Sequence, residues 1–380
     1  MKKYDIYLDN AATTKMLACV YQAMEPYFCK YYANPSGFGA SATHSRRVIN
    51  CARETIAHII GAKDSSKIYF TSGATEANNW LIKGYAFGAG VGSHIITTSI
   101  EHPSVIEVCR YLESYHGFSV TYLNPTQNGI INIEDLKKAI TPQTILISVM
   151  FANNETGAMQ PIEQIGTIAK EHGIAFHTDA VSAFCHTPIN VDKQNIDMLS
   201  LSAHKIYGPK GIGAVYIKDS SNIHPLLHGG SQERAARAGT ENIAAIVGLD
   251  SAAQFVHNHM DSEIERLFAI STFAIDGLLD IGGCSFNGDL NNRLAHICNV
   301  SFFDINTENV LVLLDRLGIV VAAGSACSSG TIENSHVLRA MGVQNPSGAL
   351  RISLGYYNTK SDIHILLKEL APIIKKLRGI

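Results

Sequence analysis

A strand–helix–strand pattern occupies the middle of the chain, in the segments TILISVM (144–150), IEQIGTIAKEH (162–172) and IAFH (174–177). The first and last segments are short, mostly apolar runs, which are typical of buried strands. In the middle segment the apolar residues recur at helical spacing, so it is predicted to be the helix that connects the two strands. This order of elements predicts a parallel sheet and an α/β fold.

The same alternation extends from about residue 45 to residue 255. A helix with one apolar face runs from Val48 to Ile60, and Gly61 is a plausible stop. Further strands are predicted at 67–70, 94–98, 119–123, 196–201 and 214–217, and further helices at 75–87, 103–116 and 134–140. We therefore predict a large domain of residues 15–255 around a mostly parallel sheet.

The rhythm changes after residue 240. One long helical stretch is predicted from about residue 241 to 279. A smaller α+β unit follows, with strands at 296–302, 319–321 and 350–354 and helices at 307–317, near 333–340 and at 361–377. We predict that residues 1–14 and 256–380 together form a small domain.

Composition narrows the class of protein. Of the 380 residues, 46% are hydrophobic and 17% are charged, which excludes an intrinsically disordered chain. Lysine and arginine total 30 against 33 acidic residues, without a basic run, so no nucleic-acid partner is expected. No apolar stretch approaches the ~20 residues of a membrane span, so no membrane association is expected.

Eight cysteines are present, without a CxxC motif or a Cys/His cluster of zinc-finger spacing. No metal site is therefore predicted. So few cysteines do not make a disulfide framework, and the reducing cytoplasm is the predicted location.

Polar residues follow several of the predicted strands, at the edge of the sheet where ligands bind in such folds. Strand 67–70 leads into TSGATE (71–76), which either presents backbone N–H groups to a phosphate or simply caps the next helix. His102, Asn154 and Asp179 follow three other strands. His102 is a helix cap, a core residue with satisfied hydrogen bonds or a catalytic group. A buried Asp179 requires a cationic partner or several donors.

The segment SLSAHKIYGPKG (200–211) is the strongest local signal for chemistry. Lys205 directly follows a predicted buried strand, among small residues and glycines. Desolvation at such a position keeps an amine nucleophilic, as a Schiff-base lysine requires. A lysine that extends from a strand end into solvent explains the same local sequence.

Together these residues form the set that pyridoxal phosphate requires. Lys205 would attach the cofactor, Asp179 would face its ring nitrogen, and His102 would stack on the ring or move protons. The turn 73–75, with Ser202 and His204, would bind the phosphate.

Two more candidates lie in the predicted small domain. Cys327, in GSACSSG (324–330), is expected to be exposed and able to reach a neighbouring cleft, which makes it the candidate nucleophile. The other seven cysteines are predicted to lie mostly in apolar helices or strands. Arg351 opens a predicted strand and either clamps a substrate carboxylate or lies on the surface.

The chain resembles the cysteine desulfurases of the NifS/IscS type, which are class V, fold-type I pyridoxal-phosphate enzymes. The resemblance covers nearly the whole chain. The matching strings are YLDNAATT (7–14), FTSGATEANN (70–79), EHPSV (101–105), NNETG (153–157), HTDAV (177–181), SLSAHKIYGPKG (200–211), GG-x-QE…R-x-GT-x-N (229–242), GSACSSG (324–330) and RISLG (351–355).

The resemblance implies a role for each matching residue. Lys205 would carry the cofactor, Asp179 would pair with its ring nitrogen, and His102 would cover the ring. Asn154 would lie beside the ring oxygen, and so would Ser182, where the family usually has glutamine. The remaining roles are phosphate binding by Ala74, Thr75, Ser202, His204 and the partner subunit's Thr240 in a homodimer, carboxylate binding by Arg351 with Asn154, and sulfur acceptance by Cys327.

The implied activity is conversion of L-cysteine to L-alanine, with the sulfur held on Cys327 as a persulfide for an acceptor protein. Such an acceptor would be an iron–sulfur scaffold or a tRNA-thiolation enzyme. Selenocysteine lyase or another class V activity, and a non-catalytic sulfur-relay or scaffold protein, are the alternatives. Besides Ser182, the chain departs from the family's usual residues at Gly37, Gly39 and Cys185.

Overall fold

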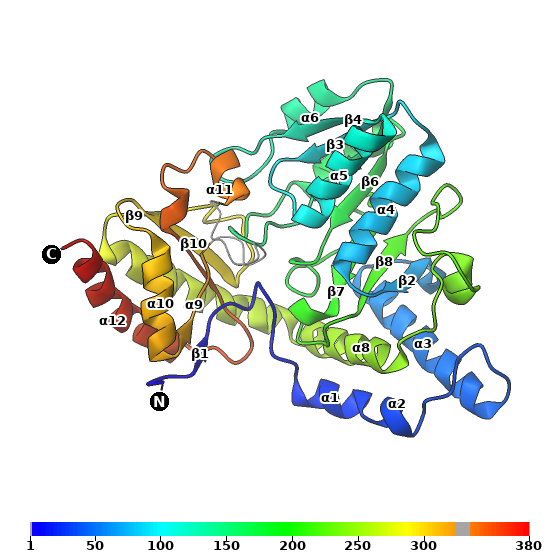
Figure 1. The fold of residues 1–380 in the computed structure, drawn as a ribbon, viewed down its shortest axis with the longest axis horizontal. Helices are drawn as coiled ribbons and strands as arrows, with labels where there is room; N and C mark the ends of the chain where they lie inside the picture. Colours follow the sequence, from blue (N-terminus) through cyan, green and yellow to red (C-terminus); the bar gives the residue numbers. More distant parts are fainter. Residues whose placement is uncertain (1, 324–334, 380) are drawn as a thin grey trace.

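The computed structural model describes residues 2–323 and 335–379. Its main feature is a seven-stranded sheet with the strand order β2-β8-β7-β6-β5-β3-β4 (Figure 1). The strands are β2 (Ile68–Thr71), β3 (His94–Thr98), β4 (Ser119–Leu123), β5 (Thr144–Ser148), β6 (Ala175–Asp179), β7 (Met198–Ser202) and β8 (Gly213–Ile217). Only the two pairs that involve β8 are antiparallel, so the predicted mostly parallel sheet is confirmed.

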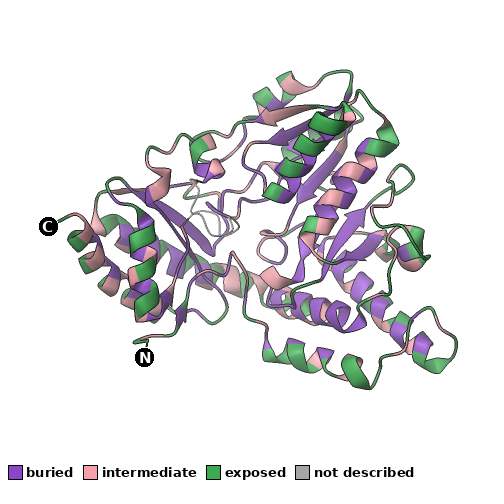
Figure 2. Ribbon diagram, viewed as in Figure 1, coloured by how far each residue is buried: buried purple, intermediate pink, exposed green. Residues whose placement is uncertain are grey.

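Helices cover both faces of this sheet. They are α3 (Ala40–Ile59), α4 (Ala74–Ala89), α5 (Pro103–His116), α6 (Ile133–Ala139), α7 (Ile162–Glu171) and α8 (Ile243–Asn258). Successive side chains of a strand point to opposite faces. Accordingly Ile95 and Leu146 join the apolar cluster beneath α4 and α5, whereas Ile96 and Ile147 join the cluster beneath α3, α7 and α8. Figure 2 shows the result, with buried strands between helices whose outer sides are exposed.

Beside the large sheet and the clusters on its two faces lies a separate apolar core, which we call the second core. It contains Ile6 and Leu8 from the start of the chain together with Leu267, Val300 and Ile352 from its last third. The elements around it are β1 (Ile6–Tyr7), α9 (Met260–Ile281), β9 (Cys284–Phe286), β10 (Ile297–Phe302), α10 (Thr307–Leu317), β11 (Ile319–Val320), β12 (Ala349–Ser353) and α12 (Lys360–Leu377). Sheet β12-β10-β9 is antiparallel and β1 pairs with β11 in parallel. The domain boundaries at residues 14 and 255 remain predictions.

Three short helices complete the described elements. Helices α1 (Ala18–Met24) and α2 (Pro26–Cys29) pack against α8, and α11 (His336–Ala340) packs its apolar side on Ile100 and Met150. Neither α1 nor α2 was predicted, and β1 and β9 were also missed. None of the helices in the described part of the chain is both long and apolar enough to span a membrane.

The long helix predicted over 241–279 is wrong, because two helices occupy this stretch. Helix α8 ends at Asn258 and α9 begins at Met260, with His259 between them at φ −112° and ψ 4°. Val256 of α8 belongs to a core of the large sheet, whereas Leu267 of α9 belongs to the second core. The chain breaks where it passes from one core to the other, and no glycine or proline marks that point in the sequence.

Candidate active site

A cavity of about 480 Å³ opens beside the carboxyl ends of β2, β3, β5, β6 and β7. Its size suits a cofactor or a small substrate. The predicted site residues that line it are Ala74, Thr75, His102, Asn154, Asp179, Ser182, Ser202, His204, Lys205 and Arg351. Thr240 is not among the described residues that line it, and Cys327 lies outside the described residues.

The turn between β2 and α4 forms one end of the cavity. Helix α4 begins at Ala74 after the N-cap Gly73, which has φ +151° and no side chain to cap the helix, and Glu76 lies in the first turn, as the capping interpretation of TSGATE predicts. The backbone N–H of Ser72 donates to the Glu76 carboxylate at 2.7 Å. The other first-turn N–H groups lack carbonyl acceptors within the helix, which suits an anion. At Gly213 of β8, a Cβ would lie only 2.9 Å from Gly73 Cα, so this approach requires glycine.

His204 and Ser202 extend this end of the cavity. The His204 Nδ1 lies 3.2 Å from the Thr13 hydroxyl. Burial, together with the nearby charge of Lys205, lowers the pKa of His204 to about 4. His204 is therefore neutral at pH 7 and available as a hydrogen-bonding group rather than as a cation.

Asp179 ends β6 and is buried. Sequence alone required a cationic partner or several donors for this carboxylate, and the structure provides two donors. Asn78 Nδ2 donates to its Oδ2 at 2.8 Å, and the Val181 N–H donates to its Oδ1 at 3.0 Å.

His102 has the capping role, which is one of the interpretations that its sequence position allowed. It is the N-cap of α5, because its Nδ1 accepts from the Ser104 N–H at 3.1 Å. Its ring also lines the cavity. Burial is the main cause of a lowered pKa for His102, and it outweighs the opposing effect of Asp179.

Lys205 closes a short 3₁₀ turn after β7. Its Nζ contacts the backbone carbonyl of Ala11 and donates to that of Ala12 at 2.8 Å. The amine is thus held at the cavity by the N-terminal segment instead of extending into solvent. The residues Ala11, Ala12 and Thr13 line the cavity too, although the motif DNAATT had been given no role in the site.

Arg351 lies in the interior of β12 and is fully buried, so the surface interpretation is wrong, as is its placement at the start of a strand. Its guanidinium donates to Asp9 Oδ1 at 2.7 Å and to the Asn154 carbonyl at 3.1 Å. Its buried Nε has no hydrogen-bond partner within the described ranges. A guanidinium has five N–H donors, so donors remain for a carboxylate.

Two buried carboxyl groups flank the site. Glu101 accepts from the Met150 N–H at 2.9 Å, and burial raises its pKa to about 8. Glu155 accepts from the Ser335 hydroxyl at 2.6 Å, and burial raises its pKa as well. The His336 ring bonds the Glu101 carbonyl at 2.9 Å. Ser335 and His336 therefore contact Glu155 and Glu101, which are the chain neighbours of Asn154 and His102.

The cysteines differ from expectation. Cys109, Cys185 and Cys298 are buried as predicted, but Cys19 and Cys51 are exposed on helices, as is Cys29. Burial raises the pKa of the Cys185 thiol, which makes it unreactive. Exposure alone therefore does not identify one thiol as the candidate nucleophile.

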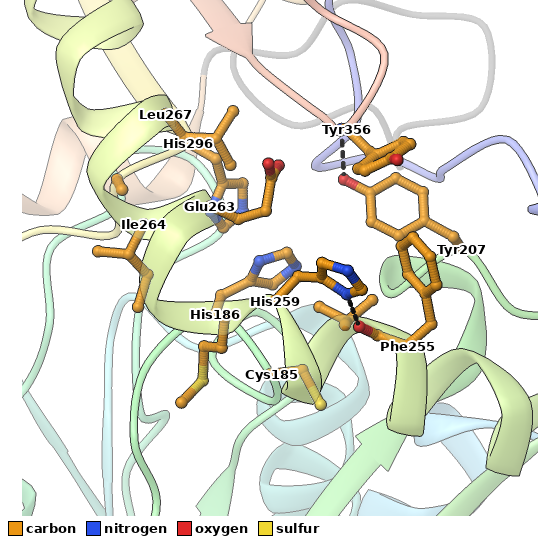
Figure 3. Close-up of a pocket in the computed structure, with 13 residues that line it drawn as sticks. Cys185, His186, Tyr207, Phe255, His259, Glu263, Ile264, Leu267, His296 and Tyr356 are labelled. Carbon is orange, nitrogen blue, oxygen red and sulfur yellow. Dashed lines mark hydrogen bonds between the residues drawn. The ribbon is translucent and has the colours of Figure 1, made fainter.

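A second pocket lies where the two cores meet, between Cys185 of one core and Leu267 of the other (Figure 3). The rings of His186 and His296 pack there with centroids 4.1 Å apart, and His186 Nε2 bonds the Lys205 carbonyl at 3.3 Å. The volume of this second pocket is only about 20 Å³, which is room for little more than a water molecule. It is too small for an amino-acid substrate.

The larger cavity fits pyridoxal phosphate. An anion-binding helix terminus, a buried carboxylate and an amine line a single space, and these are the groups that the phosphate, the ring nitrogen and the aldehyde of this cofactor require. Among the described residues, no group of three or more His, Cys, Asp or Glu side chains is placed to hold a metal ion.

Comparison with known proteins shows the family of the chain. The model of the aminotransferase class-V family matches residues 6–366. Cysteine desulfurase IscS of Dictyoglomus turgidum is 48% identical over 100% of this chain and 96% of its own length, and that of Methanosarcina thermophila is 48% identical over 98% and 93%.

Solved structures of similar proteins have the same fold. A NifS-like protein superimposes with a TM-score of 0.92 at 35% identity, covering 98% of this chain and 100% of its own. SspA in complex with cysteine superimposes with a TM-score of 0.81 at 41% identity, covering 93% and 100%. The chain thus belongs to the aminotransferase class-V family of pyridoxal-phosphate enzymes and, within that family, to the cysteine desulfurases.

Proposed function

We propose that this protein takes sulfur from L-cysteine, releases L-alanine and holds the sulfur on Cys327 as a persulfide. The observation that carries the proposal is one cavity that combines Lys205, Asp179, an anion-binding turn and Arg351. The names of two relatives and the cysteine bound to SspA support cysteine as the substrate.

The cofactor would be held at several points of the cavity. Ala74 and Thr75 would offer backbone N–H groups to its phosphate, and Ser202 and His204 would offer side chains. Asp179 would face the ring nitrogen, His102 the ring, and Asn154 and Ser182 the ring oxygen. Lys205 would attach it. When bound, pyridoxal phosphate supplies an electron sink for the α-carbon of an amino acid.

Arg351 would orient the substrate. Asp9 and the Asn154 carbonyl hold its guanidinium on two sides, so its direction is set before a carboxylate arrives. Preorganisation of this kind lowers the entropy that is lost on binding. Lys205, released from the cofactor by the substrate, would take the proton of the α-carbon on its Nζ.

Cys327 would then remove the sulfur. Its thiolate attacks the sulfur of the substrate, so a sulfur–sulfur bond forms while the carbon–sulfur bond breaks and its electron pair stays with carbon. Protonation of that carbon yields alanine. The sum is L-cysteine and a protein thiol converted to L-alanine and a protein persulfide, without an external oxidant or reductant.

We also propose a homodimer in which Thr240 completes the phosphate site of the partner. Thr240 is exposed and does not line the described cavity of its own chain, which supports this role. Large apolar side chains are unusually exposed within residues 21–38, where Phe38 is 104% and Tyr32 is 75% accessible. Exposed aromatic groups favour a protein interface.

Delivery to an acceptor protein, such as an iron–sulfur scaffold or a tRNA-thiolation enzyme, follows from the persulfide chemistry. An alanine product with a protein-bound sulfur leaves the sulfur to be collected by a second thiol. We place this chemistry in the cytoplasm, which the seven free thiols of the described residues support.

The test is incubation of the purified protein with L-cysteine and a dithiol, which reduces the persulfide and frees its outer sulfur as sulfide, with alanine and sulfide as the readouts. We expect both products from the natural protein and neither from Lys205→Ala, because the attaching amine is lost. Sulfide release by Lys205→Ala at the natural rate would contradict the proposal. A much faster reaction with selenocysteine would instead identify a selenocysteine lyase.

Cys327→Ser tests the sulfur acceptor. This variant is expected to bind the cofactor and cysteine but to form no persulfide, because a hydroxyl is a poor nucleophile toward sulfur. Cys51→Ser, which changes an exposed thiol on α3, is the matched control and should leave the persulfide in place. A persulfide mapped by mass spectrometry to another cysteine of Cys327→Ser would overturn the assignment.

A further inference from the structure

Asn78 lies on α4, about one turn after the anion-binding turn, and is fully buried. It is not among the described residues that line the cavity. Its Nδ2 donates one hydrogen bond to Asp179 Oδ2 at 2.8 Å and another to the Ser104 hydroxyl at 2.9 Å. Both N–H bonds of the side-chain amide are therefore used, on two residues from different parts of the chain.

The first bond fixes the carboxylate of Asp179. Asn78 holds one oxygen and the Val181 N–H holds the other, at 3.0 Å. With one donor on each oxygen, the plane of the carboxylate is set. A group that must face a ring nitrogen depends on this orientation.

The second bond acts on His102. Because the Ser104 oxygen accepts from Asn78, the proton of that hydroxyl is free to point at His102 Nδ1, which lies 2.8 Å away. The Ser104 N–H donates to the same nitrogen at 3.1 Å. The His102 Nδ1 therefore carries a lone pair, and in the neutral ring the proton resides on Nε2.

The amide of Asn78 has one allowed orientation. Its Oδ1 is buried without a hydrogen-bond partner in the ranges that the structure describes. A turn of the amide by 180° would place this oxygen against the Asp179 carboxylate, where two acceptors repel each other. An aspartate at this position would set two carboxylates side by side, with the same result.

We propose that Asn78 is a positioning residue that sets the Asp179 carboxylate and the His102 ring as one unit. This inference rests on the proposed function, in which these two residues contact the cofactor. Asn78 does not line the described cavity, and it acts through the hydrogen bonds that it donates.

Asn287 provides a matched control in the second core. It is buried, and its Nδ2 likewise donates to two acceptors, Asn299 Oδ1 at 2.8 Å and the Ser301 hydroxyl at 2.7 Å. Asn287→Ala therefore removes the same number of buried hydrogen bonds without contact to Asp179, Ser104 or His102. This variant therefore measures the effect of losing two buried hydrogen bonds that do not involve these three residues.

The experiment compares Asn78→Ala, Asn78→Asp and Asn287→Ala as holoenzymes. The readouts are kcat and KM for cysteine, the pH titration of the cofactor absorption, and the ¹⁵N shifts of the His102 ring. We expect Asn78→Ala to lower kcat about ten-fold with KM nearly unchanged, and Asn78→Asp to lower it further. Both should shift the absorption titration and the His102 signals, whereas Asn287→Ala should shift neither.

Two further variants separate the bond to Asp179 from the link through Ser104 to His102. They are Ser104→Ala and the double variant Asn78→Ala/Ser104→Ala. Residues that act together are not additive, so the double variant should lose little more kcat than Asn78→Ala alone. Independent, additive losses, or titrations of Asn78→Ala that overlay those of the natural holoenzyme, would overturn the inference.

The absorption and NMR readouts need the bound cofactor but no turnover. If the natural protein made no alanine from cysteine, the proposed function would fail while the role of Asn78 stayed testable. If an Asn78 variant did not fold, Ser104→Ala would decide alone, because unchanged His102 signals in that variant would overturn the inference.

Discussion

The guanidinium of Arg351 and the carboxylate of Asp9 are 2.7 Å apart, although 342 residues of chain separate them. The arginine belongs to β12, and the aspartate follows β1 at the other end of the sequence. Arg351 also lines the cavity, so the contact with Asp9 holds one of its lining side chains in place. A buried arginine without such a partner would be an uncompensated charge, which is strongly destabilising.

Arg351→Lys is the first prediction. Lysine keeps the charge but has no fork, so it cannot bond Asp9, the Asn154 carbonyl and a substrate carboxylate with the same geometry. We expect KM for cysteine to rise about ten-fold or more, with little change in cofactor absorption. Steady-state kinetics are the measurement. Arg266→Lys, outside the cavity, is the control, and an equal rise in both variants would speak against a role in substrate binding.

His177 makes the stability of the fold depend on pH. Burial lowers the pKa of His177 in the folded protein to about 4. Between that pH and the ordinary value of about 6.5, the unfolded chain binds a proton that the folded chain does not. Stability must therefore fall as the pH falls through this range, by up to about 3 kcal/mol from this group.

Urea unfolding at several pH values measures this effect. His177→Gln is expected to be less stable than the natural protein at pH 7, because contacts with Ser148 and Ser200 are altered. Its free energy of unfolding should fall less than that of the natural protein when the pH is lowered. His364→Gln changes an exposed histidine on α12 and should retain the natural slope. An unchanged slope in His177→Gln would show that this residue does not cause the loss.

Ser182→Gln concerns one of the positions at which the chain departs from the usual residues of its family. Ser182 lines the cavity next to Val181, whose N–H bonds Asp179. A glutamine amide reaches further than a serine hydroxyl and can donate to a charged ring oxygen, a bond worth about 1.5–3 kcal/mol at most. We expect a shifted pH titration of the cofactor absorption and a modest change in turnover. Superimposable titrations would place Ser182 away from the ring.

Glu76→Gln tests the support of the anion-binding turn. The Glu76 carboxylate accepts from the Ser72 N–H at 2.7 Å and from Arg237 at 2.8 and 3.1 Å. Burial opposes ionisation, but these bonds prevail and lower the pKa of Glu76. A neutral amide keeps only part of them, so we expect the cofactor Kd to rise about five-fold.

Equilibrium dialysis of the cofactor measures that affinity. Glu171→Gln, an exposed position on α7, removes the same charge at a distance from the turn and should leave the Kd unchanged. Equal effects of both substitutions would point to net charge as the cause.

The local sequence was sufficient to predict the ends of a helix where a proline or glycine at that point sets them. The predicted bounds of α5 and α10 agree with the structure, because a proline opens α5 and glycines at 117 and 318 follow the two helices in left-handed conformation. Strands β2, β3, β7 and β8 of the large sheet were found because their residues are buried on both faces. The break at His259 was missed because two cores cause it.

The sequence by itself determined the α/β fold, the kind of cofactor and most of the residues at the strand ends, since these depend on periodicity and on chemistry within a few residues. Only the tertiary structure decided which donors reach Asp179, that Asn78 joins it to Ser104, and that Asp9 holds Arg351. The physical reason is that secondary structure and strand-end chemistry depend on residues close together in the chain, whereas the hydrogen-bond partner of a buried side chain is chosen by the packing of segments that are distant in the chain.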